Sequence, residues 1–413
     1  MTRNRSLACL FGILASLAAL TPHATASDWP SFRGPNHDGI STETDWSSDF
    51  PEDAPTIAWR RNVGFGASSM IVVGDHVFTM GNLKDSNEDV IYALNVADGS
   101  VAWKFAYANP FEQRQFEGGT AATPTANDGH LYTLGSNGDI HCLAIADGKL
   151  VWKRNAGADF GGSQPNWKYA GSPLVHGDLV ILDIGGNGNS TLALDKKTGE
   201  KVWGSGADIA GYAPPIPFKN GETPAVLVFK GKAMVALALA DGKELWRIPW
   251  KTSYDVNASA PFVLGDKVFI SSGYPTGRGA LFQLGEGGPT KLWENADVKT
   301  KMNDAVYHDG HVYAISEKLG VLMCIRMTDG ETVWTQKGAG QHGNLAIAGG
   351  KLILLTDSGQ LAICNATPTG YNPISKTQIL DKRTWVNPVI ANGRIYCRDN
   401  SGNLACLDVR AKK

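Results

Sequence analysis

The stretch ALDKKTGEKVW, which spans residues 193–203 and ends at Trp203, decides the fold of this chain. Apolar residues alternate before its Thr198-Gly199 dipeptide and again after it, which is the pattern of two strands joined by a tight turn. The pattern recurs without gaps at four other places and in a looser form at a fifth. The ungapped copies end at Trp103, Trp152, Trp246 and Trp334, and the looser copy, FQLGEGGPTKLW, ends at Trp293.

The spacing of these copies indicates one repeated unit. Successive tryptophans lie 49, 51, 43, 47 and 41 residues apart, close to the roughly 40 to 50 residues of a four-stranded propeller blade. A second hairpin signal precedes the copies, as in VVGDHVFTMG (72–81) and HGDLVILDIG (176–185). Each unit is therefore predicted to be a four-stranded antiparallel meander with glycine at its turns.

The number of units predicts the architecture. A four-stranded sheet that is apolar on both faces cannot bury them alone, so the units must stack with indoles in the gaps. There are eight upstream hairpins, and dividing residues 57–410 among them gives about 44 residues for each. We therefore predict an all-β, eight-bladed β-propeller over residues 57–410.

The two ends of the repeat are expected to close the ring. The last unit stops after Arg410 without a tryptophan strand, whereas Trp59 precedes the first unit. The strand around Ile57 to Arg61 is expected to complete the eighth blade, which pairs edges that would otherwise be open. Docking between blades is predicted for seven indoles: Trp59, Trp103, Trp152, Trp203, Trp246, Trp293 and Trp334.

Unit seven departs from the pattern. Its copy, CNATPTGYNPISKTQIL, has no tryptophan near residue 376. Without a bulky ring to fill the gap beside it, the outer strand of this unit is expected to pack less tightly.

The first 56 residues are predicted to contain an export signal and a short lead-in, and neither is long enough to be a domain. Residues 1–26 are typical of an export signal, because two arginines precede the apolar run Leu7–Leu20, which ends at Ala24-Thr25-Ala26. We expect this signal to be removed and the protein to be periplasmic or secreted, without a transmembrane segment. Residues 27–56 form a lead-in that is expected to pack onto the propeller, a partner-binding arm being the alternative.

Charge and cysteine content exclude further classes. Lys and Arg number 38 against 40 Asp and Glu, so no global field attracts phosphates and nucleic acid is not an expected partner. Five cysteines follow residue 26 without a CxxC motif, and four of them occupy matching positions of the repeat. We expect them to be buried as small apolar side chains.

The repeat also resembles a known family. The copies AxDxxTGxxxW, most complete at residues 193–203, resemble the tryptophan-docking motif of the pyrroloquinoline-quinone-like (PQQ-like) eight-bladed propellers, and the resemblance covers about residues 57–410. That superfamily includes quinone-dependent alcohol dehydrogenases and non-catalytic BamB-like propellers of the outer-membrane barrel-assembly machinery. The lead-in DWPSFRGPNHDGIS also resembles exported PQQ-like repeat proteins.

A candidate site follows from the fold rather than from a catalytic motif. The sequence has no GxSxG, HExxH, GxxxxGK[ST] or EF-hand spacing. In a propeller the innermost strands begin at one mouth of the channel, where polar groups converge, although such residues also satisfy turn backbones. The residues at these starts are Ser68, Ser69, Thr123, Ser172, Asn257, Ser259, Asn303, Asp304, His342, Asn344, Trp385 and Asn387.

The resemblance assigns roles to some of these residues. The dehydrogenases of the superfamily bind a quinone here beside a calcium held by Glu and Asn, with an Asp as base. By that resemblance Asp304 would be the base, and Asn257 or Asn303 would hold calcium. The quinone would lie against Trp385, with Asn387 and Ser259 beside it. The vicinal cysteines of those enzymes are missing, so we expect no cofactor unless the dehydrogenase alternative holds, in which case PQQ and calcium would bind.

The sequence leaves three functions open. We predict an exported, non-catalytic PQQ-like propeller that serves as a protein-binding or scaffolding module of the cell envelope, monomeric and with an envelope protein as partner. The alternative is a PQQ- and calcium-dependent alcohol dehydrogenase, including the type that oxidises polyvinyl alcohol. A third is a carbohydrate-binding propeller that would use Trp167, Tyr169 and Trp385.

Overall fold

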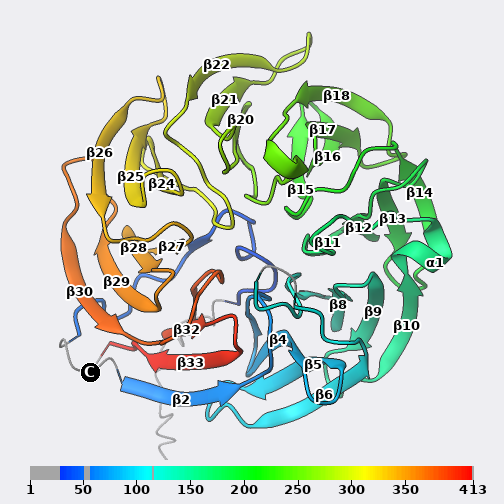
Figure 1. Ribbon diagram of the computed structural model, residues 1–413, viewed down its shortest axis with the longest axis horizontal. Coiled ribbons are helices and arrows are strands. Elements are labelled where there is room, and N and C mark those ends of the chain that lie inside the picture. The colour runs from blue at the N-terminus through cyan, green and yellow to red at the C-terminus, as the bar shows by residue number, and fades with distance from the viewer. Residues whose placement is uncertain (1–27, 51–55, 114–115, 412–413) are drawn as a thin grey trace, which may run out of the picture.

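Eight antiparallel sheets surround a central channel in the computed structural model, which describes residues 28–50, 56–113 and 116–411 (Figure 1). The all-β, eight-bladed propeller predicted from the repeat is confirmed. The expected export signal lies outside the described residues. Within these ranges the helices are α1 (Ala156–Phe160) and the 3-10 turn η1 (Ser253–Asp255), and no helix there has the length and apolarity to cross a membrane.

Each blade is a meander whose first strand lies nearest the channel and whose fourth lies outermost (Figure 1). Blades 1 to 4 contain β3 (Ile71–Val73), β4 (His76–Leu83), β5 (Glu88–Asn95), β6 (Val101–Ala108); β7 (Thr125–Asn127), β8 (His130–Leu134), β9 (Asp139–Ala144), β10 (Leu150–Asn155); β11 (Leu174–His176), β12 (Leu179–Asp183), β13 (Thr191–Asp195), β14 (Lys201–Ser205); and β15 (Ile216–Asn220), β16 (Thr223–Phe229), β17 (Ala233–Ala238), β18 (Glu244–Pro249). Blades 5 to 7 contain β19 (Phe262–Leu264), β20 (Lys267–Ser271), β21 (Gly279–Gln283), β22 (Thr290–Asn295); β23 (Val306–His308), β24 (His311–Ser316), β25 (Val321–Arg326), β26 (Thr332–Lys337); and β27 (Asn344–Ala348), β28 (Lys351–Leu355), β29 (Gln360–Asn365), β30 (Pro373–Gln378).

Blade 8 joins the two ends of the chain. It contains β31 (Val389–Ala391), β32 (Arg394–Arg398) and β33 (Asn403–Asp408), and its fourth strand is β2 (Thr56–Asn62). β2 pairs antiparallel with β33, with Trp59 opposite Cys406. The guanidinium of Arg398 adds a second link, since it donates to the backbone oxygens of Gly64, Ser68 and Met80 ahead of and within blade 1.

A β-bulge accompanies every docking tryptophan. The register between the third and fourth strands shifts once in all eight blades. In the seven blades that have a docking tryptophan, it lies beside that shift, as where Trp203 pairs with Ala193. A bulge bends its strand and re-aims a side chain. The alternation of apolar residues in the repeat does not predict this bulge.

Six of the seven indoles donate a hydrogen bond to the neighbouring blade. Their N–H groups reach backbone oxygens at 2.8–3.0 Å, and each acceptor stands three residues before a turn glycine. In five of the six blades the ring covers that glycine closely: a Cβ on Gly199, at φ +67°, would lie 2.7 Å from the ring of Trp152, whereas one on Gly370 beside Trp334 would meet nothing within 4 Å. The acceptors are Val96, Ile145, Lys196, Leu239, Met327 and Thr367.

Trp246 packs between blades 4 and 5 without this hydrogen bond. Its ring is buried in a cluster with Val268 and Phe282 of blade 5, but its N–H donates to Asn220 Oδ1 within its own blade, at 3.0 Å. Blade 5 has the turn Gly285-Glu286-Gly287-Gly288 in place of the usual Asp-Gly. The indole therefore keeps its packing role and changes its acceptor.

In blade 7 the lead-in covers the position that lacks a tryptophan. Ser375 stands opposite Ile363 at the bulge, and its hydroxyl donates to the backbone oxygen of Ser48 at 2.7 Å. Trp46 and Phe50 join the apolar cluster between blades 7 and 8. A distant part of the chain thus supplies the bulk that the repeat itself omits.

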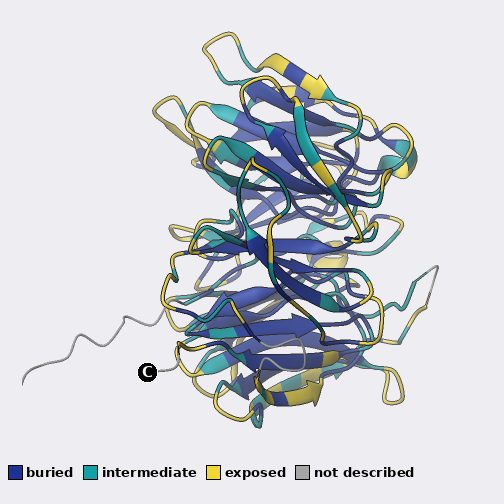
Figure 2. Ribbon diagram, turned by 90° about the vertical axis from the view of Figure 1, so that its left-hand side faces the viewer, coloured by how far each residue is buried: buried dark blue, intermediate teal, exposed yellow. Residues whose placement is uncertain are grey.

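The apolar core lies within and between the blades, and the exposed residues gather on loops at the ends and on the rim (Figure 2). The five cysteines between residues 142 and 406 are free and buried, as expected from their positions in the repeat.

Candidate functional site

The lead-in runs through the middle of the ring along the inner strands (Figure 1). Trp29 exchanges backbone hydrogen bonds with Val72 of blade 1, and the oxygen of Pro30 accepts from Ala126 of blade 2. β1 (Ile40–Ser41) then pairs in parallel with β27 of blade 7. The segment therefore fills part of the channel rather than lying across one opening.

Asp304, the predicted base, anchors the lead-in. Arg33 is 2% exposed, and its Nη1 lies 3.4 Å from Asp304 Oδ2. The same carboxylate accepts from the Ala260 N–H at 2.6 Å and from Asn387 Nδ2 at 3.0 Å. Two hydrogen-bond donors and the Arg33 cation therefore hold this carboxylate in a structural role at the centre of the channel.

A cavity of about 220 Å³ lies at the channel mouth, and we call it the cup. Phe32 of the lead-in contributes to it from within the channel, and loops between blades supply the remaining wall. Its aromatic lining consists of Phe32, Phe116, Trp167, Tyr169, Tyr212 and Trp385. Its polar lining includes Ser69, Asn109, Ser136, Asp304, Asn387 and Asn400.

Two aromatic rings and an arginine frame one side of the cup. Phe116 meets Trp385 edge to face, with ring centres 4.4 Å apart and planes at 71°. The guanidinium of Arg383 lies 5.3 Å from the centre of the Trp385 ring and forms an ion pair with Glu117 at 3.4 Å. These contacts hold the indole of Trp385 in place by a cation–π contact and an aromatic pair.

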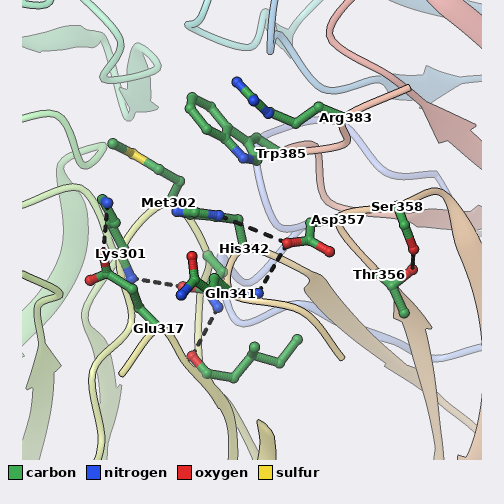
Figure 3. A network of polar contacts seen from close by, with 12 residues as sticks. Lys301, Met302, Glu317, Gln341, His342, Thr356, Asp357, Ser358, Arg383 and Trp385 are labelled. Atoms are coloured by element: carbon green, nitrogen blue, oxygen red, sulfur yellow. Dashed lines mark hydrogen bonds and ion pairs between the residues drawn. The ribbon is translucent and has the colours of Figure 1, made fainter. Parts of the chain in front are cut away.

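His342 supports Trp385 from behind (Figure 3). The two ring centres are 5.2 Å apart, and His342 Nδ1 lies 4.0 Å from Asp357 Oδ2. Burial lowers the pKa of His342 to about 4, an effect to which the Lys301 cation adds and which the Glu317 carboxylate opposes. His342 is therefore neutral at neutral pH, and its Nε2 has no hydrogen-bond partner among the described residues.

Beside the cup, the mouth carries a pair of tyrosines in strained backbone. Tyr254 and Tyr274 both have φ of +67°, which is an outlier for a bulky residue and costs of order 1–3 kcal/mol. Their rings meet at 5.6 Å, and the ammonium of Lys301 lies 4.3 Å from the centre of the Tyr274 ring. Tyr254 is nevertheless 73% exposed, so the strain holds a large aromatic surface in solvent.

The geometry around the expected calcium ligands does not fit that role. Asn257 Oδ1 accepts from Ser272 Oγ at 2.7 Å, and its Nδ2 donates to the backbone oxygens of Lys230 and Gly231, so the amide is committed to structural hydrogen bonds. Asn303 Oδ1 accepts from the Lys301 N–H at 2.7 Å. Ser259 is buried and does not line the cup. Of the residues to which the resemblance assigns roles, Asp304, Trp385 and Asn387 line the cup, and Ser69 joins them from the wider set of strand starts.

Several residues of the mouth lie outside the predicted site. Phe116, Tyr254 and Tyr274 belong to no copy of the repeat, and the sequence places Arg33 only in the lead-in. One signal was available: sixteen residues separate β6 from β7 and eighteen separate β10 from β11, and loops of this length in compact domains are usually functional. Phe116 and Trp167 lie in these two loops.

Comparison with known proteins places this fold among relatives. A family model described as outer membrane protein assembly factor BamB matches residues 86–336. BamB of Yersinia pestis is 23% identical over 331 residues, which cover 76% of this chain and 75% of that protein. BamB from Moraxella catarrhalis has a TM-score of 0.64 at 15% identity, over 86% of this chain and 99% of that one.

The same fold occurs in an enzyme. Quinohemoprotein alcohol dehydrogenase from Comamonas testosteroni has a TM-score of 0.68 at 12% identity, over 94% of this chain and 81% of that one. At such identity the likeness concerns the fold alone, and function has to be argued from the site.

Proposed function

The chain belongs to the family of outer membrane protein assembly factor BamB, and on that premise we propose that it is a non-catalytic propeller which binds a protein partner of the cell envelope. The observation that carries the proposal is the strained tyrosine pair at the channel mouth, in which Tyr254 is exposed and Tyr274 is half-buried beneath it. The similarity to BamB of Yersinia pestis, which its name describes as an assembly factor, supports a partner of the same kind.

The chemistry of the tyrosine pair suits a protein interface. Tyrosine, tryptophan and arginine are enriched at the centres of interfaces, where they dominate the binding energy. Tyr254 offers a large ring whose backbone is already fixed, so little conformational entropy is lost on binding. Lys301 and Glu317 add charged groups next to it, with their ion pair at 2.6 Å.

The surroundings of Asp304 support a role without catalysis. A base must be free to accept a proton from substrate, whereas this carboxylate is held by Arg33, Ala260 and Asn387. The dehydrogenase alternative would require that the lead-in leave the channel. Accordingly, saturating PQQ with calcium should not change the melting temperature of the purified protein, and a rise would favour the enzyme, since a ligand of the folded state stabilises it.

The proposed location is the periplasm or the cell exterior. The arginines and the apolar run of residues 1–26 support export, and the BamB relatives support a place in the envelope. Processing is measured as the N-terminal residue of the protein recovered from periplasm and medium, with Ser27 expected. An unprocessed chain confined to the cytoplasm would contradict this part of the proposal.

The partner proposal is tested with matched surface variants. Tyr254→Ala should reduce recovery of a co-purifying envelope protein at least tenfold, because one buried aromatic anchor is worth about 2 kcal/mol or more. Val202→Ala, which alters an exposed side chain on the outer rim, should leave recovery unchanged. Equal recovery with both variants, or a protein that purifies without a partner from its own envelope, would overturn the proposal.

A further inference from the structure

The cup presents flat aromatic faces from different parts of the ring. Phe116 comes from the loop between blades 1 and 2, Trp167 from the loop between blades 2 and 3, and Trp385 from the loop between blades 7 and 8. All three are only half-buried, so part of each ring remains open to a ligand. Such faces bind ligands through apolar C–H or ring surfaces.

The charges around the cup are already neutralised. Glu117 is paired with Arg383 at 3.4 Å, Lys168 with Glu112 at 2.8 Å, and Asp304 with Arg33 at 3.4 Å. An anion or a cation entering the cup would have to compete with one of these pairs or remain unpaired in a partly desolvated place, which is costly. The cup therefore favours a neutral ligand.

One polar atom of the cup lining lacks a partner. Among the described residues, nothing donates to Asn387 Oδ1, whose Nδ2 donates to Asp304 Oδ2. The indole N–H of Trp385 also has no acceptor there, but its nitrogen is buried and does not face a ligand. A ligand hydroxyl, which can donate a hydrogen bond, would satisfy the Asn387 oxygen.

The size of the cup limits what enters. Its volume of about 220 Å³ is below the roughly 300–1,000 Å³ of pockets that enclose a drug-sized ligand. It accommodates a single ring, and the cup is open at the mouth so that further units of a chain would extend outward.

From these four features we infer that the cup binds a neutral saccharide by the terminal ring of a glycan chain. A pyranose ring combines an apolar C–H face, which would stack on Trp167 or Trp385, with a rim of hydroxyls that both donate and accept. The site is separate from the tyrosine pair proposed for the protein partner, and it adds a second ligand class to the same mouth.

The test is saturation-transfer NMR on the purified full chain, with maltotriose, cellotriose and chitotriose as separate probes. We expect transfer to the protons of a terminal ring of at least one trisaccharide. Trp167→Ala removes a stacking face and Trp385→Phe reduces the other from an indole to a single six-membered ring, so each should weaken binding at least fivefold. Val202→Ala on the outer rim should bind as the unaltered protein does.

Two results would overturn the inference. One is the absence of transfer to any of the three trisaccharides at millimolar concentration. The other is unchanged binding in both cup variants, which would place the sugar elsewhere. Trp385→Phe decides the outcome if Trp167→Ala does not fold. Because the measurement uses protein without a partner, its failure would leave the proposed protein interface untouched.

Discussion

At the scale of single residues, the contact between a turn glycine and an indole holds neighbouring blades together. Gly199 and Gly177 belong to the same blade and both have positive φ, but a Cβ on Gly177 would meet nothing within 4 Å, whereas one on Gly199 would meet the Trp152 ring. Alanine at either position lowers the free energy of unfolding by about 1–2 kcal/mol, because the backbone is left-handed there. Gly199→Ala should lower it by about 1–3 kcal/mol more than Gly177→Ala, because the added methyl group would clash with the indole. Urea denaturation of the two variants measures the difference, and equal costs would refute the docking contact.

Breaking the ion pair between Arg33 and Asp304 should also lower the free energy of unfolding by a large amount. Both side chains are almost fully buried, and removing one member of such a pair leaves an uncompensated charge at a cost of roughly 3–5 kcal/mol. Arg33→Met should therefore destabilise the fold by that amount. The double variant Arg33→Met with Asp304→Asn should recover part of the loss in the same denaturation series. A single variant within about 1 kcal/mol of the parent would show that the lead-in is not anchored there.

The residues of the cup show how far sequence reasoning reaches at this scale. Trp385, Asn387 and Asp304 were identified because propeller geometry brings the starts of inner strands to one mouth. Phe116 and Tyr254 were missed because they belong to loops, where no periodicity reports which side chains meet. The partner of Asp304 was missed for a related reason, since Arg33 is 271 residues away in sequence and the pairing depends on the path of the lead-in.

At the scale of elements, the lead-in takes the place of a docking tryptophan. Trp46 packs in the cluster between blades 7 and 8, where β30 has Ser375 instead of an indole. Trp46→Ala should cost roughly 3–5 kcal/mol, as expected for a large buried side chain. Trp167→Ala, which truncates a half-buried ring at the mouth, serves as control and should cost clearly less. If the two cost the same in thermal denaturation, the lead-in does not serve as part of this interface.

The strands were predictable because their signal is local. Alternating apolar residues and Asp-Gly or Thr-Gly turns recur in nearly every blade, so the hairpins and their number followed from the printed sequence. The bulge beside each tryptophan and the parallel pairing of β1 with β27 did not follow. The bulge depends on how the outermost strand of a blade pairs with the third strand, which the alternation of apolar residues does not report. The lead-in has no second copy in the chain, so its pairing partner cannot be found by aligning repeats.

At the scale of the whole molecule, one buried and two half-buried histidines should make the propeller sensitive to acid. Burial lowers the pKa values of His37, His141 and His342 to about 4, against an ordinary value near 6.5 in the unfolded chain. Between these values the unfolded state binds more protons, so stability is full above about pH 6.5 and falls as the pH decreases toward 4. Each histidine should contribute about 1–3 kcal/mol to this fall.

Replacing one of these histidines checks the assignment. His342→Gln should flatten the decline of unfolding free energy between pH 6.5 and 4, and His176→Gln, at an exposed position, should not. Parallel pH profiles for His342→Gln and the parent protein would mean that His342 titrates alike in both states.

The two proposed binding sites, the tyrosine pair and the cup, lie on the same face of the propeller. The blades are locked by indoles, the channel is occupied by the lead-in, and the tyrosine pair and the cup open at the mouth. Residues on the rim and at the opposite end of the ring should therefore make no specific contact with a partner.

Site-specific photo-crosslinking in intact cells tests this claim most directly. A benzophenone amino acid is placed at position 254 at the mouth, at 202 on the rim, or at 264 where β19 ends at the opposite face, all of them exposed positions. We predict one discrete adduct with an envelope protein from position 254 and none from the other two. The same adduct from all three positions, or from 202 or 264 alone, would contradict it.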